Sequence, residues 1–141
     1  MALKTDRIEF QSKLIAVKAT LRVGALFALL GICVLSLVPG EYRPHTMILP
    51  AEFEHVAAYS VAALFLGLVR AGRLSAARLV LMLTIYGGLL ELCQLWIPGR
   101  NAQVIDIAAD FVGSSIGVSV ASVLMHFYRK LTSTKGSLYL R

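Results

Sequence analysis

Four long apolar stretches, separated by short segments rich in charge, proline or glycine, restrict what this chain can fold into. They cover about residues 23–39, 53–69, 79–97 and 104–127. Since a helix needs roughly 20 apolar residues to cross the hydrocarbon of a bilayer, four crossings use most of the 141 residues. A charged fraction of 16% and a mean hydropathy of +0.74 are far from those of a water-soluble domain. We therefore predict an all-α protein, a membrane-spanning bundle of four transmembrane helices within residues 23–128.

The two ends of the chain are basic and lie outside the predicted spans. Within residues 1–22, apolar and basic side chains fall on separate helical stripes, which favours a short N-terminal amphipathic helix on an anionic leaflet. A partly disordered basic tail is the alternative. Residues 129–141 form a second basic tail. We reject a secretory signal, because 22 residues precede the first apolar stretch and no A-x-A cleavage pattern follows it.

Basic residues are distributed unevenly between the two sides of the predicted bundle. The segments 1–22, 70–78 and 129–141 hold all but two of the 14 Lys and Arg residues, and the exceptions are Arg43 and Arg100. By the positive-inside rule, the basic side is cytoplasmic. We predict a multi-pass protein of the bacterial cytoplasmic (inner) membrane, with both termini in the cytoplasm. This distribution also accounts for the net charge of +6, so we expect membrane lipids as partners and no nucleic acid.

Three of the four stretches carry polar and small residues at the spacing i, i+4, i+7 and i+11, which is one face of a helix. These faces are His55, Tyr59, Ala62 and Leu66; Gly87, Glu91, Gln94 and Pro98; and Asp106, Asp110, Gly113 and Gly117. A charged carboxyl group at mid-membrane costs at least about 2.5 kcal/mol, so such residues normally face a bundle interior or a wet cavity. We predict that the three faces converge in one polar pocket that opens away from the cytoplasm.

The polar residues of these faces, together with an arginine in the turn after residue 97, are candidates for function. They are Glu91, Asp106 and His55 for catalysis, if the chain is an enzyme, and Tyr59, Gln94, Arg100 and Asp110 for binding. Each also has a plainer interpretation. His55 could be a histidine at the membrane surface, Glu91 with Gln94 a packing contact, and Arg100 a solvated cation.

Small residues and cysteines point to packing rather than chemistry. Gly87, Gly113 and Gly117 are predicted helix-packing positions, and the last two form a GxxxG pattern that lets helix backbones approach. Cys33 and Cys93 stand singly, without the spacing that holds zinc or an iron–sulfur cluster. We therefore expect no cofactor, although a single histidine with carboxylates could hold a divalent metal.

In this order, the residues resemble the VanZ-like family of small bacterial integral membrane proteins. The likeness covers about residues 20–128. It is carried by Glu54–Tyr59, Tyr86–Gln94, Pro98–Arg100, Asp106–Asp110, Gly113 and Gly117. It implies that the signature residues are His55, Tyr59, Glu91, Gln94, Arg100, Asp106 and Gly113. Two positions depart from the pattern: Asp110 stands where asparagine is usual, and the acid-Lys pair that often precedes the histidine reads Glu52-Phe53-Glu54.

The family takes its name from a member associated with glycopeptide antibiotic resistance, and its biochemical activity is not established. The likeness therefore implies an architecture and a site in the cell envelope rather than a reaction. Our first hypothesis is a pocket that binds a lipid head group or another envelope component, with Arg100 engaging an anionic group. The alternative is an intramembrane enzyme that acts on an envelope lipid or lipid-linked sugar by carboxylate acid/base chemistry. Proton-coupled transport is the weakest of the three hypotheses, because four unbroken helices make a poor alternating-access device unless they dimerise. A homo-oligomer is therefore a further possible partner arrangement.

The charge distribution predicts a specific topology. A reporter that is active only outside the cytoplasm should be active when fused after Arg100, since that segment is expected to lie across the membrane from the basic segments. The same reporter fused after Arg141 should be inactive. Activity of a cytoplasm-only reporter after Arg100 would overturn the orientation.

Overall fold

A computed structural model describes residues 2–42, 50–70 and 74–138 of the chain. It contains four α-helices, which are α1 (Ala2–Leu37), α2 (Ala51–Val69), α3 (Ala76–Gln94) and α4 (Val104–Leu138), and a short 3-10 turn, η1 (Gly40–Tyr42). All four helices are long and apolar enough to cross a membrane, and the described residues form no strand. The predicted fold class is therefore confirmed. Arg43, Arg73 and Arg141, which entered the charge argument, lie outside the described residues.

The helix boundaries follow local signals in the sequence. Two acidic residues, Glu52 and Glu54, lie in the first turn of α2, where negative charge interacts favourably with the helix dipole. The Ser75 hydroxyl caps α3 by accepting a hydrogen bond from the Arg78 backbone N–H at 3.2 Å. Beyond α3, the chain turns at Gly99, whose φ of +72° is readily adopted only by glycine.

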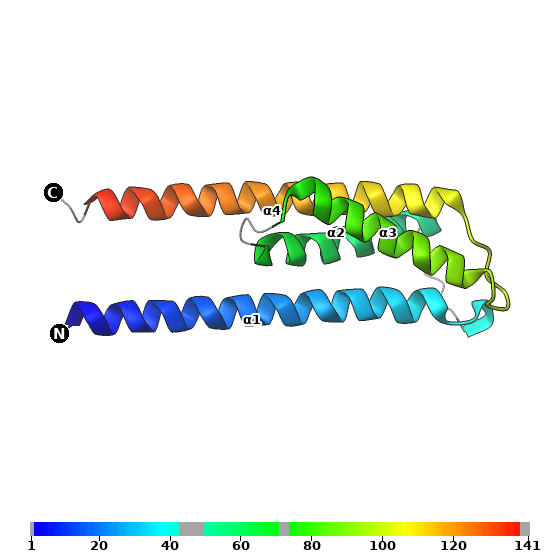
Figure 1. The fold of residues 1–141 in the computed structure, drawn as a ribbon, viewed down its shortest axis with the longest axis horizontal. Coiled ribbons are helices and arrows are strands. Elements are labelled where there is room, and N and C mark those ends of the chain that lie inside the picture. Colours follow the sequence, from blue (N-terminus) through cyan, green and yellow to red (C-terminus); the bar gives the residue numbers. More distant parts are fainter. Residues whose placement is uncertain (1, 43–49, 71–73, 139–141) are drawn as a thin grey trace.

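The first and last helices are longer than the spans predicted for them. Residues 2–22 are helical, but they continue directly into the first span instead of forming a separate element, and α4 continues past residue 127 to Leu138. The sequence explains the first difference, because no proline or glycine precedes Gly24 to interrupt the helix. Figure 1 shows both extensions projecting in the same direction beyond α2 and α3, at the end of the bundle where the two termini lie. We call this the terminus end and the opposite end the far end.

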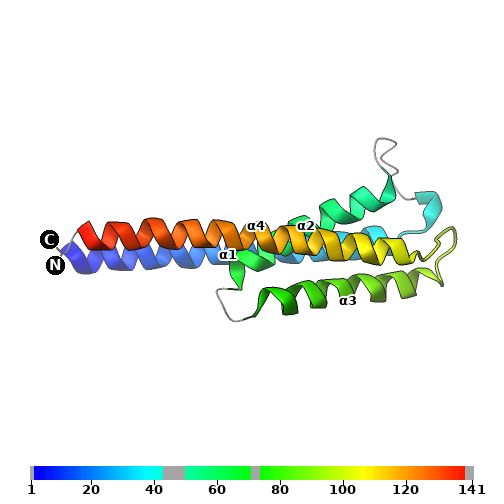
Figure 2. The same ribbon diagram turned by 90° about the horizontal axis from the view of Figure 1, so that it is seen from above.

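The centre of the bundle is a parallel pair of helices, α2 and α4. Contacts between them run in the same direction along both helices, from His55 with Asp110 at the far end to Arg70 with Ser122 toward the terminus end. The first helix packs mainly against α2, and α3 packs mainly against α4 (Figures 1 and 2). Although α2 and α3 are consecutive in the chain, α2 contacts α3 far less than it contacts α4.

Small residues explain why α2 and α4 approach so closely. A Cβ at Gly113 would meet the Val56 backbone, and a Cβ at Gly117 would meet the backbone oxygen of Ser60. The Ser60 hydroxyl also donates a hydrogen bond of 3.0 Å to the carbonyl oxygen of Gly113. Both glycines of the GxxxG pattern therefore lie at this contact. Close approach through small residues, with a hydrogen bond across the interface, is how helices associate in lipid, where burial of apolar surface supplies little driving force.

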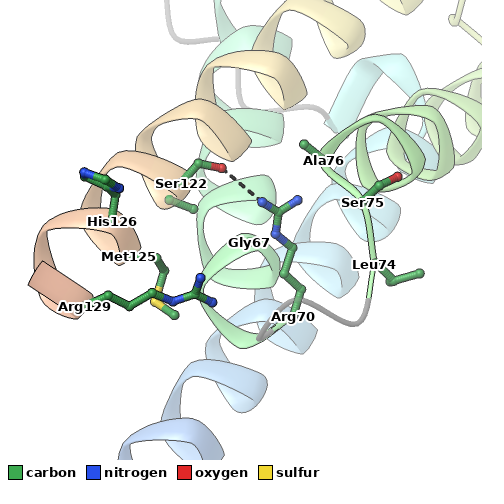
Figure 3. A pocket seen from close by; sticks show the side chains of 10 residues that line it. Gly67, Arg70, Leu74, Ser75, Ala76, Ser122, Met125, His126 and Arg129 are labelled. Carbon is green, nitrogen blue, oxygen red and sulfur yellow. Dashed lines mark hydrogen bonds between the residues drawn. The ribbon is translucent and has the colours of Figure 1, made fainter. Parts of the chain in front are cut away.

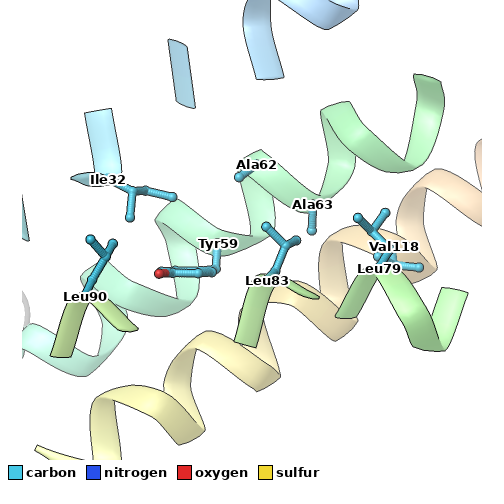
Figure 4. Packing of buried hydrophobic residues seen from close by; sticks show 8 residues of the cluster. All are labelled: Ile32, Tyr59, Ala62, Ala63, Leu79, Leu83, Leu90 and Val118. Atoms are coloured by element: carbon cyan, nitrogen blue, oxygen red, sulfur yellow. The ribbon is translucent and has the colours of Figure 1, made fainter. Parts of the chain in front are cut away.

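Apolar side chains are distributed as expected for a protein surrounded by lipid. A small buried cluster joins the four helices, as Figure 4 shows, and consists of Ile32, Tyr59, Ala62, Ala63, Leu79, Leu83, Leu90 and Val118. Many larger side chains point outward instead, among them Phe27, Leu81 and Phe111. Such exposure would favour aggregation in water, whereas a bilayer covers it.

The contact between α2 and α4 predicts a selective effect of one added methyl group. Gly113→Ala places a Cβ against the Val56 backbone, 2.9 Å from its Cα, so the two helices must separate. We expect the free energy of unfolding to fall by about 1–3 kcal/mol, the usual cost of overpacking. Thermal unfolding in detergent measures this. Gly31→Ala is the matched control, because its Cβ would meet nothing within 4 Å; an equal loss in both variants would contradict the packing.

Candidate functional site

Two helices bring three acidic side chains together inside the far end of the bundle. Glu91 comes from α3, and Asp106 and Asp110 come from successive turns of α4. Their exposed fractions are only 3%, 7% and 1%. The carboxylates therefore face the interior of the bundle and not the lipid.

A histidine from α2 lies between two of these carboxylates. His55 Nδ1 is 2.9 Å from Asp110 Oδ1, and His55 Nε2 is 3.9 Å from Asp106 Oδ2. The ring of Tyr59, one helical turn further along α2, is nearly parallel to the His55 ring, with 6.4 Å between ring centroids. Asp110 thus orients the His55 ring through Nδ1, while Asp106 lies near its other nitrogen and the buried Tyr59 lies beside it.

Gly87 leaves room for the second oxygen of Asp110. A Cβ at this position would overlap Asp110 Oδ2 and come within 2.8 Å of the Tyr59 hydroxyl. Asp110 Oδ2 has no hydrogen-bond partner within the described ranges of the chain. Gly87 was predicted as a helix-packing residue, and the structure shows what it packs against, namely the polar group of Asp110 and Tyr59.

Glu91 links α3 to the start of α4. Its Oε2 accepts a hydrogen bond of 2.9 Å from the backbone N–H of Gln103, the residue before α4. The backbone oxygen of Gln103 in turn accepts from the N–H of Asp106 at 3.1 Å. Gln103 was not singled out from the sequence. The one feature of the sequence that could have indicated its role is its position, three residues before Asp106 and at the start of a predicted span.

One subset of these residues has the donor atoms and proximity of a cation site. A nitrogen of His55 and one carboxylate oxygen each of Glu91 and Asp106 all lie within 4.8 Å of one another. An imidazole with two carboxylates suits divalent metals such as zinc or manganese. The same three groups could instead act on a bound molecule as general acids and bases, the usual role of carboxylate and imidazole side chains in an enclosed site.

Two cavities adjoin at the far end and differ in character. The first has a volume of about 170 Å³ and is lined mainly by polar groups, among them His55, Gln94, Arg100 and Asp106. The second, of about 420 Å³, lies between α3 and α4 and is lined mostly by apolar side chains, with Glu91 as its acidic member. Gln103 lines both cavities. We call them the polar far-end cavity and the apolar far-end cavity.

Arg100 is directed at the end of α1. Its Nε donates to the Val38 carbonyl oxygen at 3.2 Å, and its Nη2 donates to the Ser36 oxygen at 2.9 Å and to the Leu35 oxygen. A cation there satisfies the last carbonyls of the helix and interacts favourably with the negative end of its dipole. The sequence suggested a solvated cation or an anchor for an anion. The structure adds a third role, a cap on α1.

Two Pro-Gly segments close the far end beside this cap. The Gly40 N–H donates to the Pro98 carbonyl oxygen at 3.1 Å, and a Cβ at Gly40 would overlap the backbone oxygen of Gly99. The loop after α1 therefore lies directly against the loop after α3. Together with Arg100, this contact fixes one wall of the polar far-end cavity.

Comparisons with protein-family models, with curated proteins and with solved structures give no match to this chain. The likeness to the VanZ-like family therefore stays a hypothesis that rests on the motif residues.

The position of Arg100 predicts that its removal weakens the fold. Arg100→Gln loses the charged donors to the α1 carbonyls, so we expect the free energy of unfolding to fall by about 1.5–3 kcal/mol. Arg100→Lys should lie between this variant and the wild type, because it keeps the charge but not the planar fork of donors. Thermal unfolding in detergent measures both. Unchanged stability of Arg100→Gln would show that the cap contributes nothing.

Proposed function

We propose that this multi-pass membrane protein belongs to the bacterial cell envelope and binds an amphiphilic envelope component, a lipid or a lipid-linked precursor, at the far end of its bundle. The single observation that carries the proposal is the pair of adjoining cavities, one polar and one apolar, with Gln103 lining both. A lipid has the same two parts. Its head group would occupy the polar far-end cavity and the start of its chain the apolar one, between α3 and α4.

The polar residues indicate which head groups fit. Glu91, Asp106 and Asp110 supply carboxylate oxygens, which accept hydrogen bonds when ionised, while Arg100 directs donors at the backbone of α1. This balance favours a head group that itself donates hydrogen bonds, such as sugar hydroxyls or an ammonium group. The alternative expectation, an anionic group held by Arg100, receives less support from these contacts.

The likeness to the VanZ-like family is part of this proposal. Most of its signature residues are those that converge at the far end, including His55, Tyr59, Glu91, Gln94 and Asp106. Their convergence supports a shared site. With the likeness comes the proposed link to glycopeptide antibiotic resistance, for which a site that holds an envelope component is a plausible physical basis.

A second function, intramembrane catalysis, is favoured by one specific observation. His55 forms a short contact of 2.9 Å with Asp110, and its other nitrogen faces Asp106 at 3.9 Å. In an enzyme acting on an envelope lipid or a lipid-linked sugar, Glu91 would act as general acid or base, Asp106 as the complementary carboxylate, and His55 as proton relay. A divalent cation held by these three residues would serve the same chemistry by polarising an oxygen of the substrate.

Carboxylate-to-amide substitutions test the proposal and separate the two functions. We expect the wild type to co-purify with lipids of one head-group class. In Glu91→Gln and Asp106→Asn, the amount of this lipid retained should fall by about tenfold or more, the usual effect of losing a charge-assisted hydrogen bond. Mass spectrometry of extracted lipids measures this. Glu41→Gln is the matched control, since Glu41 is an exposed carboxylate at the same end of the bundle.

The lipid profile of whole cells then distinguishes binding from catalysis. Binding alone predicts an unchanged profile in cells that carry the Glu91 and Asp106 variants at normal protein level. Accumulation of one lipid precursor in both variants would favour the enzyme. Equal lipid retention by the wild type and all three variants would refute the far-end site.

A further inference from the structure

A third cavity lies on the terminus side of the bundle, away from the far-end site. Its volume is about 330 Å³, and it is enclosed by the end of α2, the start of α3 and the adjoining part of α4. Its polar lining residues are Arg70, Ser75, Ser122, His126 and Arg129. Figure 3 shows Arg70 reaching from the end of α2 toward Ser122 on α4, and Arg129 extending from α4 toward the same space. We call this the terminus-side cavity.

The charge of this cavity is of one sign. Two arginines line it, and none of its described lining residues is Asp or Glu. The guanidinium of Arg70 donates through Nη2 to the Ser122 hydroxyl at 3.0 Å. Its Nη1 is buried and has no hydrogen-bond partner in the part of the chain that the structure describes. A buried charged donor without an acceptor is costly, so an anionic acceptor beside Nη1 would be favourable.

The depth of the cavity places it at the level of lipid head groups. With 19 residues, α2 is about 28 Å long, close to the roughly 30 Å thickness of the hydrocarbon core. Arg70 follows its last residue and so lies where the acyl region ends. The capped start of α3 at Ser75 also lines the cavity and adds the positive end of a helix dipole.

We propose that the terminus-side cavity binds the phosphate of an anionic phospholipid from the leaflet on that side of the membrane. Arg70 and Arg129 donate to the phosphate oxygens, for which the planar guanidinium fork is well shaped. Basic pockets between membrane helices hold anionic head groups in this way. The Ser75 hydroxyl lies at the same cavity and provides a neutral donor, whereas the Ser122 hydroxyl donates to the Val118 carbonyl oxygen at 2.8 Å. This site is independent of the proposed far-end function.

Lipid retention by the purified full-length chain tests this site. Native mass spectrometry in detergent would compare phosphatidylglycerol with zwitterionic phosphatidylcholine. We expect the wild type to prefer phosphatidylglycerol, and Arg70→Gln and Arg129→Gln each to retain it about tenfold less. Arg78→Gln is the matched control, because Arg78 is an exposed arginine in the first turn of α3 that does not line the cavity.

Two further arms keep the test decisive. Ser122→Ala removes the partner of Arg70 but leaves both arginines, so it should still retain phosphatidylglycerol and show that loss in Arg70→Gln is not a loss of fold. Inorganic phosphate added at the same concentration as the lipid should not displace it.

Equal retention by the wild type, Arg70→Gln and Arg129→Gln overturns the site, and full displacement by inorganic phosphate overturns its assignment to a lipid. The Glu91 variant should retain phosphatidylglycerol normally, so failure here and failure of the far-end site are distinguishable.

Discussion

The close approach of α2 and α4 at Gly113 and Gly117 is the contact on which the rest of the structure depends. A single Cβ on either glycine would meet backbone atoms of α2, so the distance between these helices is set by the absence of side chains. The same approach brings His55 of α2 within 2.9 Å of Asp110 of α4, one turn before Gly113. In lipid, where apolar surfaces attract each other weakly, such a steric fit with hydrogen bonds is what defines a helix pair. The polar site is therefore a consequence of helix packing.

Burial of the three carboxylates is offset in part by what α2, α3 and the chain before α4 supply to them. For Asp110, α2 provides the His55 ring, and α3 provides the empty space at Gly87. For Glu91, the chain before α4 provides a backbone N–H from Gln103. Polar groups buried without such partners would be costly. The first helix adds no acidic group, and its loop instead closes the far end through Gly40, Pro98 and the Arg100 cap.

Much of the fold could be predicted from the sequence because hydropathy and helical periodicity are local properties. Four spans were predicted, and the faces that begin at His55, Gly87 and Asp106 point inward as their spacing indicated, except for Pro98, which is exposed beyond the end of α3. What could not be predicted depends on contacts between distant segments. The Arg100 cap joins residues more than 60 positions apart, and the pairing of α2 with α4 follows from a match between Gly113 and the Val56 backbone that no periodicity reveals. The continuity of α1 was missed because a change in composition near residue 22 was taken for a change in structure.

The two ends of the α2–α4 pair carry opposite chemistry, and this follows from where charge can be placed along a spanning helix. At the far end, His55 and the aspartates lie inside the first turns of their helices, enclosed by neighbouring chain, and present mainly acceptors. At the other end, Arg70 and Arg129 line the terminus-side cavity and present mainly donors. Between them the two helices meet mainly through small residues, such as Gly117 against the Ser60 backbone and the Ala63 side chain, together with the hydrogen bond from Ser60 to Gly113. Because this intervening contact is mainly steric, we expect a change of charge at one end to have little effect at the other.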